Sequence, residues 1–273
     1  AIGWGSDEKS FRKWWPANYH LIGKDILTTH AVYWPTMLMA SEIPLPKTIF
    51  AHGWWLSGES KMSKSLGNVV NPLDIIDEYG VDPLRYYLMR DMVLGQDASF
   101  TFESFIKRYN SDLANDFGNL VNRVTILIHK HFDSRIPDFG TFNEVDLELV
   151  GSAKTIPQIV RNNIEELKIP DALEKTIGLM RLINKYLETK APWKSVKTDS
   201  SPKSDAANTL YIATDTLRIS AQLLAPVMPT KIDDILKMLG GDRIDINDFS
   251  TGGLKSGTKL GEGKSPFPRI TLE

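Results

Sequence analysis

The segment at residues 19–52 restricts the fold more than any other, because it predicts two strands joined by a helix. Residues 19–22 form a short apolar run that ends in Gly23, and residues 48–52 predict a second strand. Between them, residues 26–39 have the apolar spacing of a helix. A strand, a helix and a strand with short links are typical of a βαβ crossover, in which the two strands lie parallel in one sheet.

One face of the predicted helix carries a distinctive set of side chains. Ile26, His30 and Trp34 recur every four residues and therefore share that face. Pro35 is expected to kink the helix. Aliphatic and aromatic walls suit an apolar, polarisable ligand. On these residues alone, a core with one hydrogen-bonded histidine is the more common explanation, and both interpretations stay open.

The loop GESKMSKSLGN at residues 58–68 holds two lysines and three serines, with a glycine close to either end. Glycines let the backbone bend, and lysines with serine hydroxyls suit an oxyanion such as phosphate. The alternative is a solvated basic turn. Ligands of parallel sheets bind beyond the carboxyl ends of the strands. Because this loop and residues 23–25 both follow predicted strands, a nucleotide is expected beside them.

The sequence after Val70 is predicted to be helical almost to its end, so a helical bundle follows half of an α/β sheet. Asn71 before Pro72 is a typical helix start. A long amphipathic pattern over residues 105–128 predicts one apolar stripe. The stripe consists of Leu113, Phe117, Leu120, Val124 and Leu127. Further helices are predicted at residues 145–168, 171–189, 203–225 and 229–239.

Composition excludes several classes of protein. The 273 residues contain no cysteine, which excludes disulfides and thiolate metal sites. No apolar run has the length needed to cross a bilayer. The net charge of −2 gives no overall basic bias, so a nucleic acid would have to be bound by a local surface.

Four stretches carry a resemblance to a known family: HLIGKDILTTHAVYWP, AHGWWLSGESKMSKSLGNVVNP, YGVDPLRYYLMRD and PFPRI. KMSKS resembles the second signature of class I aminoacyl-tRNA synthetases, and its surroundings resemble the methionyl family within that class. The resemblance covers essentially the whole chain. It implies half of a Rossmann-type parallel sheet followed by a mainly α-helical bundle. It divides the chain into part of the catalytic domain (residues 1–56), the KMSKS loop and stem-contact region (57–110) and an anticodon-binding domain (111–273).

The resemblance implies ATP-dependent activation of methionine and its esterification to tRNA(Met), with Mg²⁺ accompanying ATP. Such chemistry needs no enzyme nucleophile and depends on positioning and charge stabilisation. The implied catalytic residues are Lys61 and Lys64, which neutralise the leaving pyrophosphate. The implied ATP-binding residues are Gly23, Asp25, His52, Gly53, Lys61, Met62, Ser63, Lys64 and Ser65. On the residues alone, Asp25 is equally typical of a helix N-cap.

Two further binding sets follow from the resemblance. The set for the methionine side chain is Ile26, His30 and Trp34, and the set for the anticodon is Asn119, Arg123 and Trp193. The asparagine and the arginine are four residues apart on a predicted helix and project from one side. An aromatic ring can stack on an unpaired base. On the residues alone, an exposed polar pair and a core tryptophan are the alternatives.

The family's first signature, His-x-Gly-His, is missing from the five histidines. We therefore expect the C-terminal half of the synthetase core, without zinc and inactive on its own. The alternatives are a tRNA-binding module without catalysis and a synthetase of the leucyl, isoleucyl or valyl group. Carboxylates interrupt the basic residues of the helical part, so tight tRNA binding by this chain alone is not expected. We expect a cytoplasmic monomer that does not bind membranes.

Overall fold

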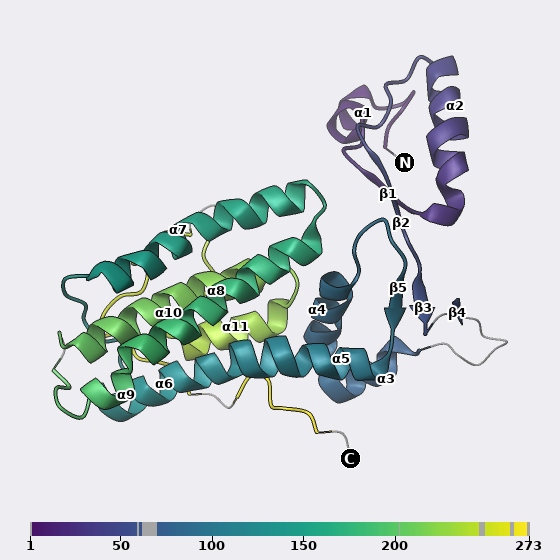
Figure 1. The fold of residues 1–273 in the computed structure, drawn as a ribbon. Helices are drawn as coiled ribbons and strands as arrows, with labels where there is room; N and C mark the ends of the chain where they lie inside the picture. Colours follow the sequence, from purple (N-terminus) through teal and green to yellow (C-terminus); the bar gives the residue numbers. More distant parts are fainter. Residues whose placement is uncertain are drawn as a thin grey trace. The chain divides into compact units, whose positions relative to one another are not determined.

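The computed structural model describes residues 2–58, 60–61, 70–201, 203–245, 249–262 and 265–271, and the chain divides into two compact units. Unit 1 comprises Ala1–Val70 and Met92–Phe100, and unit 2 comprises Asn71–Asp91 and Thr101–Glu273. Figure 1 labels the helices and strands of both units. The chain therefore leaves unit 1, returns to it for one short segment and then completes unit 2.

Unit 1 contains the predicted βαβ crossover. Its first elements are α1 (Glu8–Trp14), β1 (His20–Gly23), the 3₁₀ turn η1 (Lys24–Ile26), the π-helical turn η2 (Thr29–Tyr33), α2 (Trp34–Ala40) and β2 (Ile49–His52). Strands β1 and β2 pair in parallel, which confirms the predicted crossover. The helical segment runs from η2 into α2 without a break, and Pro35 lies where the π-helical turn gives way to α2, so its predicted kink stays a prediction.

A second small sheet in unit 1 was not predicted from the sequence. It has the order β4-β3-β5, formed by β3 (Trp55–Ser57), β4 (Ser60–Lys61) and β5 (Ala98–Phe100). Strand β3 pairs antiparallel with β4 and parallel with β5. The rings of Trp55 and Phe100 meet edge to face with 6.4 Å between their centroids. These strands are too short to produce a recognisable alternation of apolar and polar residues.

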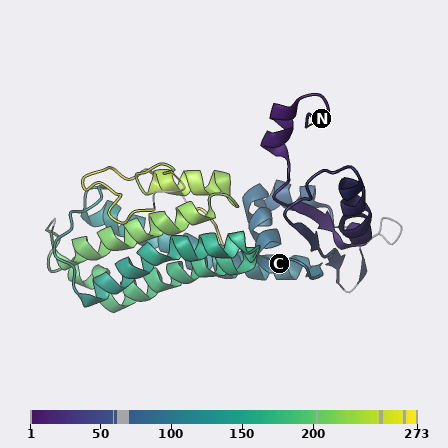
Figure 2. The same cartoon turned by 90° about the horizontal axis from the view of Figure 1, so that it is seen from above.

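Unit 2 is helical. Its elements are α3 (Pro72–Tyr79), α4 (Val81–Asp91), α5 (Phe102–Arg108), the π-helix η4 (Tyr109–Gly118), α6 (Asn119–His131), α7 (Glu144–Glu165), α8 (Ile169–Lys190), α9 (Pro192–Ser195), α10 (Asp205–Leu224) and α11 (Pro229–Met238). Helices α7, α8 and α10 run alongside one another (Figures 1 and 2). Every residue of α10 from Ala206 to Gln222 is buried, so this helix forms the centre of the bundle. Among the described residues, no helix is both long and apolar enough to cross a membrane.

The apolar stripe predicted over residues 105–128 is largely confirmed. Leu113, Phe117, Leu120 and Val124 are completely buried. The last position is wrong, because Leu127 is half-buried and the buried residue is its neighbour Ile128. Val124 and Ile128 are four residues apart on the regular helix α6, so they share one buried face.

One buried carboxylate connects three helices of unit 2. Asp146, in the first turn of α7, accepts hydrogen bonds from the Tyr186 hydroxyl of α8 at 2.8 Å and from Asn208 Nδ2 of α10 at 3.1 Å. It also accepts the backbone N–H of Asn143 in a capping box. Burial raises the pKa of Tyr186, and the hydrogen bond to Asp146 raises it further, so the hydroxyl remains a donor at neutral pH.

Asp146→Asn is expected to destabilise the bundle by roughly 3 kcal/mol, because an amide cannot satisfy three donors from the positions of a carboxylate. The free energy of unfolding from urea denaturation, followed by circular dichroism, measures this loss. Glu148→Gln is the matched control, since Glu148 is exposed on the same helix and should change stability by less than about 0.5 kcal/mol. Equal stability of the two variants would contradict the assignment.

Candidate functional site

The carboxyl ends of β1 and β2 lie side by side in unit 1. Gly23 is the register partner of His52, so the last residues of the two parallel strands meet at one edge. Asp25 follows in the η1 turn, and its Oδ1 lies 2.5 Å from the position of a Cβ on Gly23. Only glycine therefore fits at position 23 while the Asp25 carboxylate keeps this orientation. The structure therefore brings together three predicted ATP-binding residues, Gly23, Asp25 and His52.

Gly53 continues this edge directly after β2. A Cβ at position 53 would overlap the backbone carbonyl of Gln96, so the returning segment before β5 packs directly on the Gly53 backbone. The His52 Nδ1 lies 2.8 Å from the Gly53 carbonyl oxygen. The close approach of the two segments explains why position 53 requires glycine.

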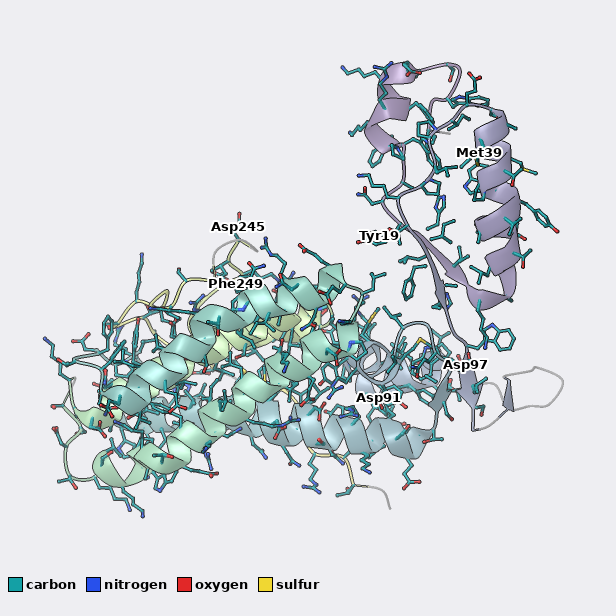
Figure 3. All side chains as sticks on the ribbon, turned by 45° about the horizontal axis from the view of Figure 1, so that its top comes forward. Tyr19, Met39, Asp91, Asp97, Asp245 and Phe249 are labelled. Atoms are coloured by element: carbon teal, nitrogen blue, oxygen red, sulfur yellow. The ribbon has the colours of Figure 1, made fainter. Side chains whose placement is uncertain are left out.

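An ion pair lies on the same edge and was not predicted from the sequence. The ammonium of Lys24 donates to both carboxylate oxygens of Asp97 at 2.7 Å and lies 4.3 Å from the centre of a Trp54 ring. The backbone N–H of Trp54 donates to Asp97 Oδ1 at 2.9 Å. Hydrogen bonding from Lys24, and then from the Trp54 backbone, lowers the pKa of Asp97. Asp97, labelled in Figure 3, directly precedes β5.

The predicted catalytic loop is only partly described. The backbone of Lys61 lies in β4, where it is the register partner of Leu56 in β3. Met62, Ser63, Lys64 and Ser65 lie outside the described residues, as does the side chain of Lys61. The roles of these residues remain predictions. The hairpin nevertheless begins three residues after β2, which connects the candidate lysines directly to the strand-end edge.

A hollow of about 680 Å³ in unit 1 contains two of the three predicted methionine-binding residues. His30 and Trp34 line it together with Tyr19 and Met37, whereas Ile26 is exposed and does not line it. The Trp34 indole N–H points to His20 Nε2 at 3.3 Å, and the Nδ1 of His30 lies 3.0 Å from the Ile26 carbonyl oxygen.

The three predicted anticodon residues belong to unit 2. Asn119 is exposed on the first turn of α6, and Arg123 follows one turn later with a half-buried side chain. The guanidinium carbon of Arg123 lies 5.3 Å from the centre of a Trp193 ring, which is a cation–π contact between α6 and α9. The structure therefore joins the arginine and the tryptophan directly, although 70 residues separate them in the sequence.

A polar hollow of about 380 Å³ surrounds Asn119 and Arg123. Its lining residues are Asn115, Asp116, Asn119, Arg123, Arg181, Asn184, Lys185 and Glu188. The Glu188 carboxylate lies 3.9 Å from the Arg123 guanidinium, and Arg123 Nη1 is buried without a hydrogen-bond partner among the described residues. A buried N–H of this kind lowers the stability of the fold unless a ligand or a water molecule accepts a hydrogen bond from it.

Helix α8 supplies half of the polar hollow, and sequence reasoning missed this contribution. Arg181 donates to Asp116 at 2.6 Å and to Glu174 at 2.7 Å, and the Asn184 amide donates to the Asp116 carbonyl oxygen at 3.2 Å. Residues 181, 184, 185 and 188 recur at helical spacing, so a polar stripe on α8 was a usable signal. No group of three or more potential metal ligands is present among the residues that the structure describes.

Two family models match the chain. Residues 3–125 match tRNA synthetases class I (M), and residues 136–270 match the anticodon binding domain of methionyl tRNA ligase. The first match ends within α6, and the second begins after that helix.

Curated relatives match over the full length of the chain. Methionine–tRNA ligase of Clostridium acetobutylicum is 42% identical over 100% of this chain, and that of Bacillus subtilis is 40% identical over 100% of it. The chain covers 42% of the length of each. It therefore spans about two fifths of the length of the curated relatives that it matches.

Solved structures of methionyl-tRNA synthetases also match nearly the whole chain. Mycobacterium tuberculosis methionyl-tRNA synthetase in complex with methionyl-adenylate is 39% identical, with a TM-score of 0.89 over 96% of this chain and 52% of that one. The apo form from the same organism is 36% identical, with a TM-score of 0.88 over 98% of this chain and 52% of that one.

Gly53→Ala is expected to lower the stability of unit 1 by roughly 1–3 kcal/mol, because the added methyl overlaps the Gln96 carbonyl. Six of the seven tryptophans lie within residues 1–70, so the thermal midpoint of tryptophan fluorescence reports mainly on unit 1. Gly140→Ala is the control, since an added Cβ there meets nothing within 4 Å. An unchanged fluorescence midpoint in Gly53→Ala would refute the close contact.

Proposed function

The chain belongs to the methionyl-tRNA synthetase family of class I tRNA synthetases, and we propose that it supplies the nucleotide-binding edge and the anticodon-binding helices of a methionine–tRNA ligase. The reaction is activation of methionine by ATP followed by transfer to tRNA(Met). The observation that carries this proposal is the pairing of Gly23 with His52 at the carboxyl ends of parallel strands, where nucleotides bind in α/β sheets.

In the first step, the methionine carboxylate attacks the α-phosphorus of ATP and pyrophosphate leaves. The ammonium groups of Lys61 and Lys64 neutralise the charge that develops on the leaving group. Removing one such contact typically costs two to three decades in rate, or about 3 kcal/mol. Met62, Ser63 and Ser65 complete the phosphate-binding loop, and Mg²⁺ enters with ATP as part of the substrate.

The strand-end edge binds the adenosine part of ATP in this proposal. The Asp25 carboxylate accepts hydrogen bonds from the ribose hydroxyls, and the backbone at Gly23 permits the close approach of the sugar. His52 and Gly53 provide the backbone surface for the adenine. Support comes from the crowding at both glycines, since a side chain at position 23 would displace the Asp25 carboxylate and one at position 53 would displace the Gln96 backbone.

The methionine side chain is assigned to the hollow beside β1. His30 and Trp34 are assigned to its wall, whereas the methionine-binding role predicted for Ile26 has no support from the lining of this hollow. Aromatic walls suit a thioether because sulfur interacts favourably with ring edges.

The anticodon is assigned to the polar hollow of unit 2. Asn119 and Arg123 offer donors and acceptors for base edges, and Trp193 offers a ring for stacking. The cation–π contact between Arg123 and Trp193 supports this assignment, since it brings a hydrogen-bond donor and a stacking surface next to each other.

A tRNA-binding module without catalysis is the second candidate function. It is supported by the fact that every lining residue of the polar hollow belongs to unit 2. The division at residues 1–56, 57–110 and 111–273 remains a proposal, as do a monomeric state, the absence of zinc and membrane binding, and a cytoplasmic location. The leucyl, isoleucyl and valyl alternatives receive no support from the relatives named above.

The 273-residue chain alone is expected to show no appreciable methionine-dependent ATP–pyrophosphate exchange, because it lacks the His-x-Gly-His signature. Adding the N-terminal part of a methionine–tRNA ligase that carries this signature should restore exchange. The control is the chain that carries both Lys61→Ala and Lys64→Ala. With this variant, the restored rate of exchange should be at least about 100-fold lower than with the unchanged chain. Strong exchange by the chain alone, or no restoration, would argue against the proposed division of the site.

Trp193→Ala is expected to weaken binding to tRNA with a CAU anticodon by roughly 1–3 kcal/mol, the usual value of one stacked base. Binding to tRNA with an altered anticodon should fall much less, because stacking on the cognate base is already absent. Filter binding at a fixed, low salt concentration measures both. Trp14→Ala is the control, since Trp14 is 60% exposed in unit 1. Equal losses for both tRNAs would exclude base recognition by Trp193.

A further inference from the structure

The ion pair between Lys24 and Asp97 has no role in the function proposed above. We propose that this pair is a positioning element for ATP, which holds the carboxyl ends of β1 and β2 at the spacing that the nucleotide requires. This inference rests on the proposed function, because it assigns ATP to that edge of unit 1. It adds two residues that act through their neighbours and do not touch the reacting atoms.

The connectivity of the pair supports this role. Lys24 stands between Gly23 and Asp25, directly after β1, whereas Trp54 follows Gly53, directly after β2. The Asp97 carboxylate receives the Lys24 ammonium from one side and the Trp54 backbone N–H from the other. One carboxylate therefore bridges the residues that follow the two strands, and the segment that carries it returns to unit 1 from a distant part of the sequence.

Steric contacts reinforce the bridge. The Gln96 carbonyl packs on the Gly53 backbone so closely that a Cβ is excluded, and this contact involves the residue just before Asp97. The Lys24 ammonium also lies over a Trp54 ring at 4.3 Å. The turn after β1, the turn after β2 and the segment before β5 are thus fixed against one another by an ion pair, a backbone hydrogen bond, a cation–π contact and a backbone contact.

Exposure argues against a purely structural role for the pair. The side chains of Lys24 and Asp97 are 40% and 34% exposed, and pairs this accessible to water contribute little to global stability. Their effect should be local, on the geometry of the edge. The bridge also keeps the Lys24 ammonium neutralised next to Asp25, so that this charge is not free to draw the phosphates of ATP toward the ribose-binding carboxylate.

The test uses the full-length protein that carries this sequence, with ATP–pyrophosphate exchange as the assay. Asp97→Asn and Lys24→Met should each raise KM for ATP roughly five- to tenfold, the usual effect of losing one charge-assisted hydrogen bond at a partly exposed site. KM for methionine, kcat and the thermal midpoint should stay within about twofold, or about 2 °C, of wild type. The double variant should raise KM for ATP no more than either single variant does, because Lys24 and Asp97 act as one unit.

Two further variants test whether the effect is specific to the charge of Lys24 and to this ion pair. Lys24→Arg should restore KM for ATP, since a guanidinium can pair with the carboxylate and stack on Trp54. Glu8→Gln is the matched control, because it removes the Arg12–Glu8 ion pair of α1 at 2.8 Å in the same unit and should change nothing. A lower KM for ATP in Asp97→Asn would overturn the inference by showing that freed Lys24 binds phosphate directly. Additive effects, an unchanged KM for ATP or parallel changes in both KM values would also overturn it.

The outcome for the wild-type protein separates this inference from the proposed function. Absence of methionine-dependent exchange in wild type would refute the proposed function and the inference with it. Active wild type together with unaffected Asp97→Asn would refute the inference alone.

Discussion

The parallel pairing of β1 with β2 is the constraint on which the whole strand-end edge depends. Parallel strands need a crossover connection, and here the segment from η1 to α2 provides it. Because both strands run in the same direction, Gly23 and His52 end at one edge, and the polar turns that follow them must share that edge. An antiparallel pair would have separated these residues by the length of a strand. The Asp25 carboxylate at Gly23 and the Gln96 backbone at Gly53 then limit which residues the edge can contain.

Unit 2 uses a different device, because a fully buried helix has no polar face to set its rotation. Residues 206–222 of α10 are buried on every side, so the contrast between a buried and a solvated face gives it no preferred rotation. Two buried carboxylates give α10 a preferred rotation. Asp146 of α7 bonds to Asn208 near the start of α10, and Asp215 in the middle of α10 pairs with Arg218 and accepts the Gly252 N–H of the final irregular segment. Charged groups that lack water require their partners, so these contacts select one arrangement of the helices.

Sequence patterns predicted the long elements well and the short ones poorly. Helices of about 20 residues contain several turns of apolar spacing, and α7, α8 and α10 were therefore predicted to within a few residues. Strands β3 and β5 have three residues each, and their pairing joins segments more than 40 residues apart, so local periodicity could not reveal it. The same limit applies to the site. Residues next to a recognisable motif were predicted, whereas Asp97 and Arg181 are brought to their sites only by tertiary contacts.

The charge balance of the polar hollow bears on the proposed recognition of an anticodon by a chain of net charge −2. Arg181 is occupied by Asp116 and Glu174, and Glu188 lies near Arg123, so Lys185 is the only cation of the lining that forms no ion pair within the described residues, and little positive charge is left for phosphates. Affinity from phosphate contacts scales with the number of free cations, and a surface of this kind contributes little of it. The remaining polar groups of the lining are instead directional: they are the amides of Asn115, Asn119 and Asn184 and the guanidinium of Arg123, which lies over the ring of Trp193. Such groups distinguish base edges and stacking faces, which fits the anticodon-binding role proposed for the hollow better than binding driven by phosphate charge.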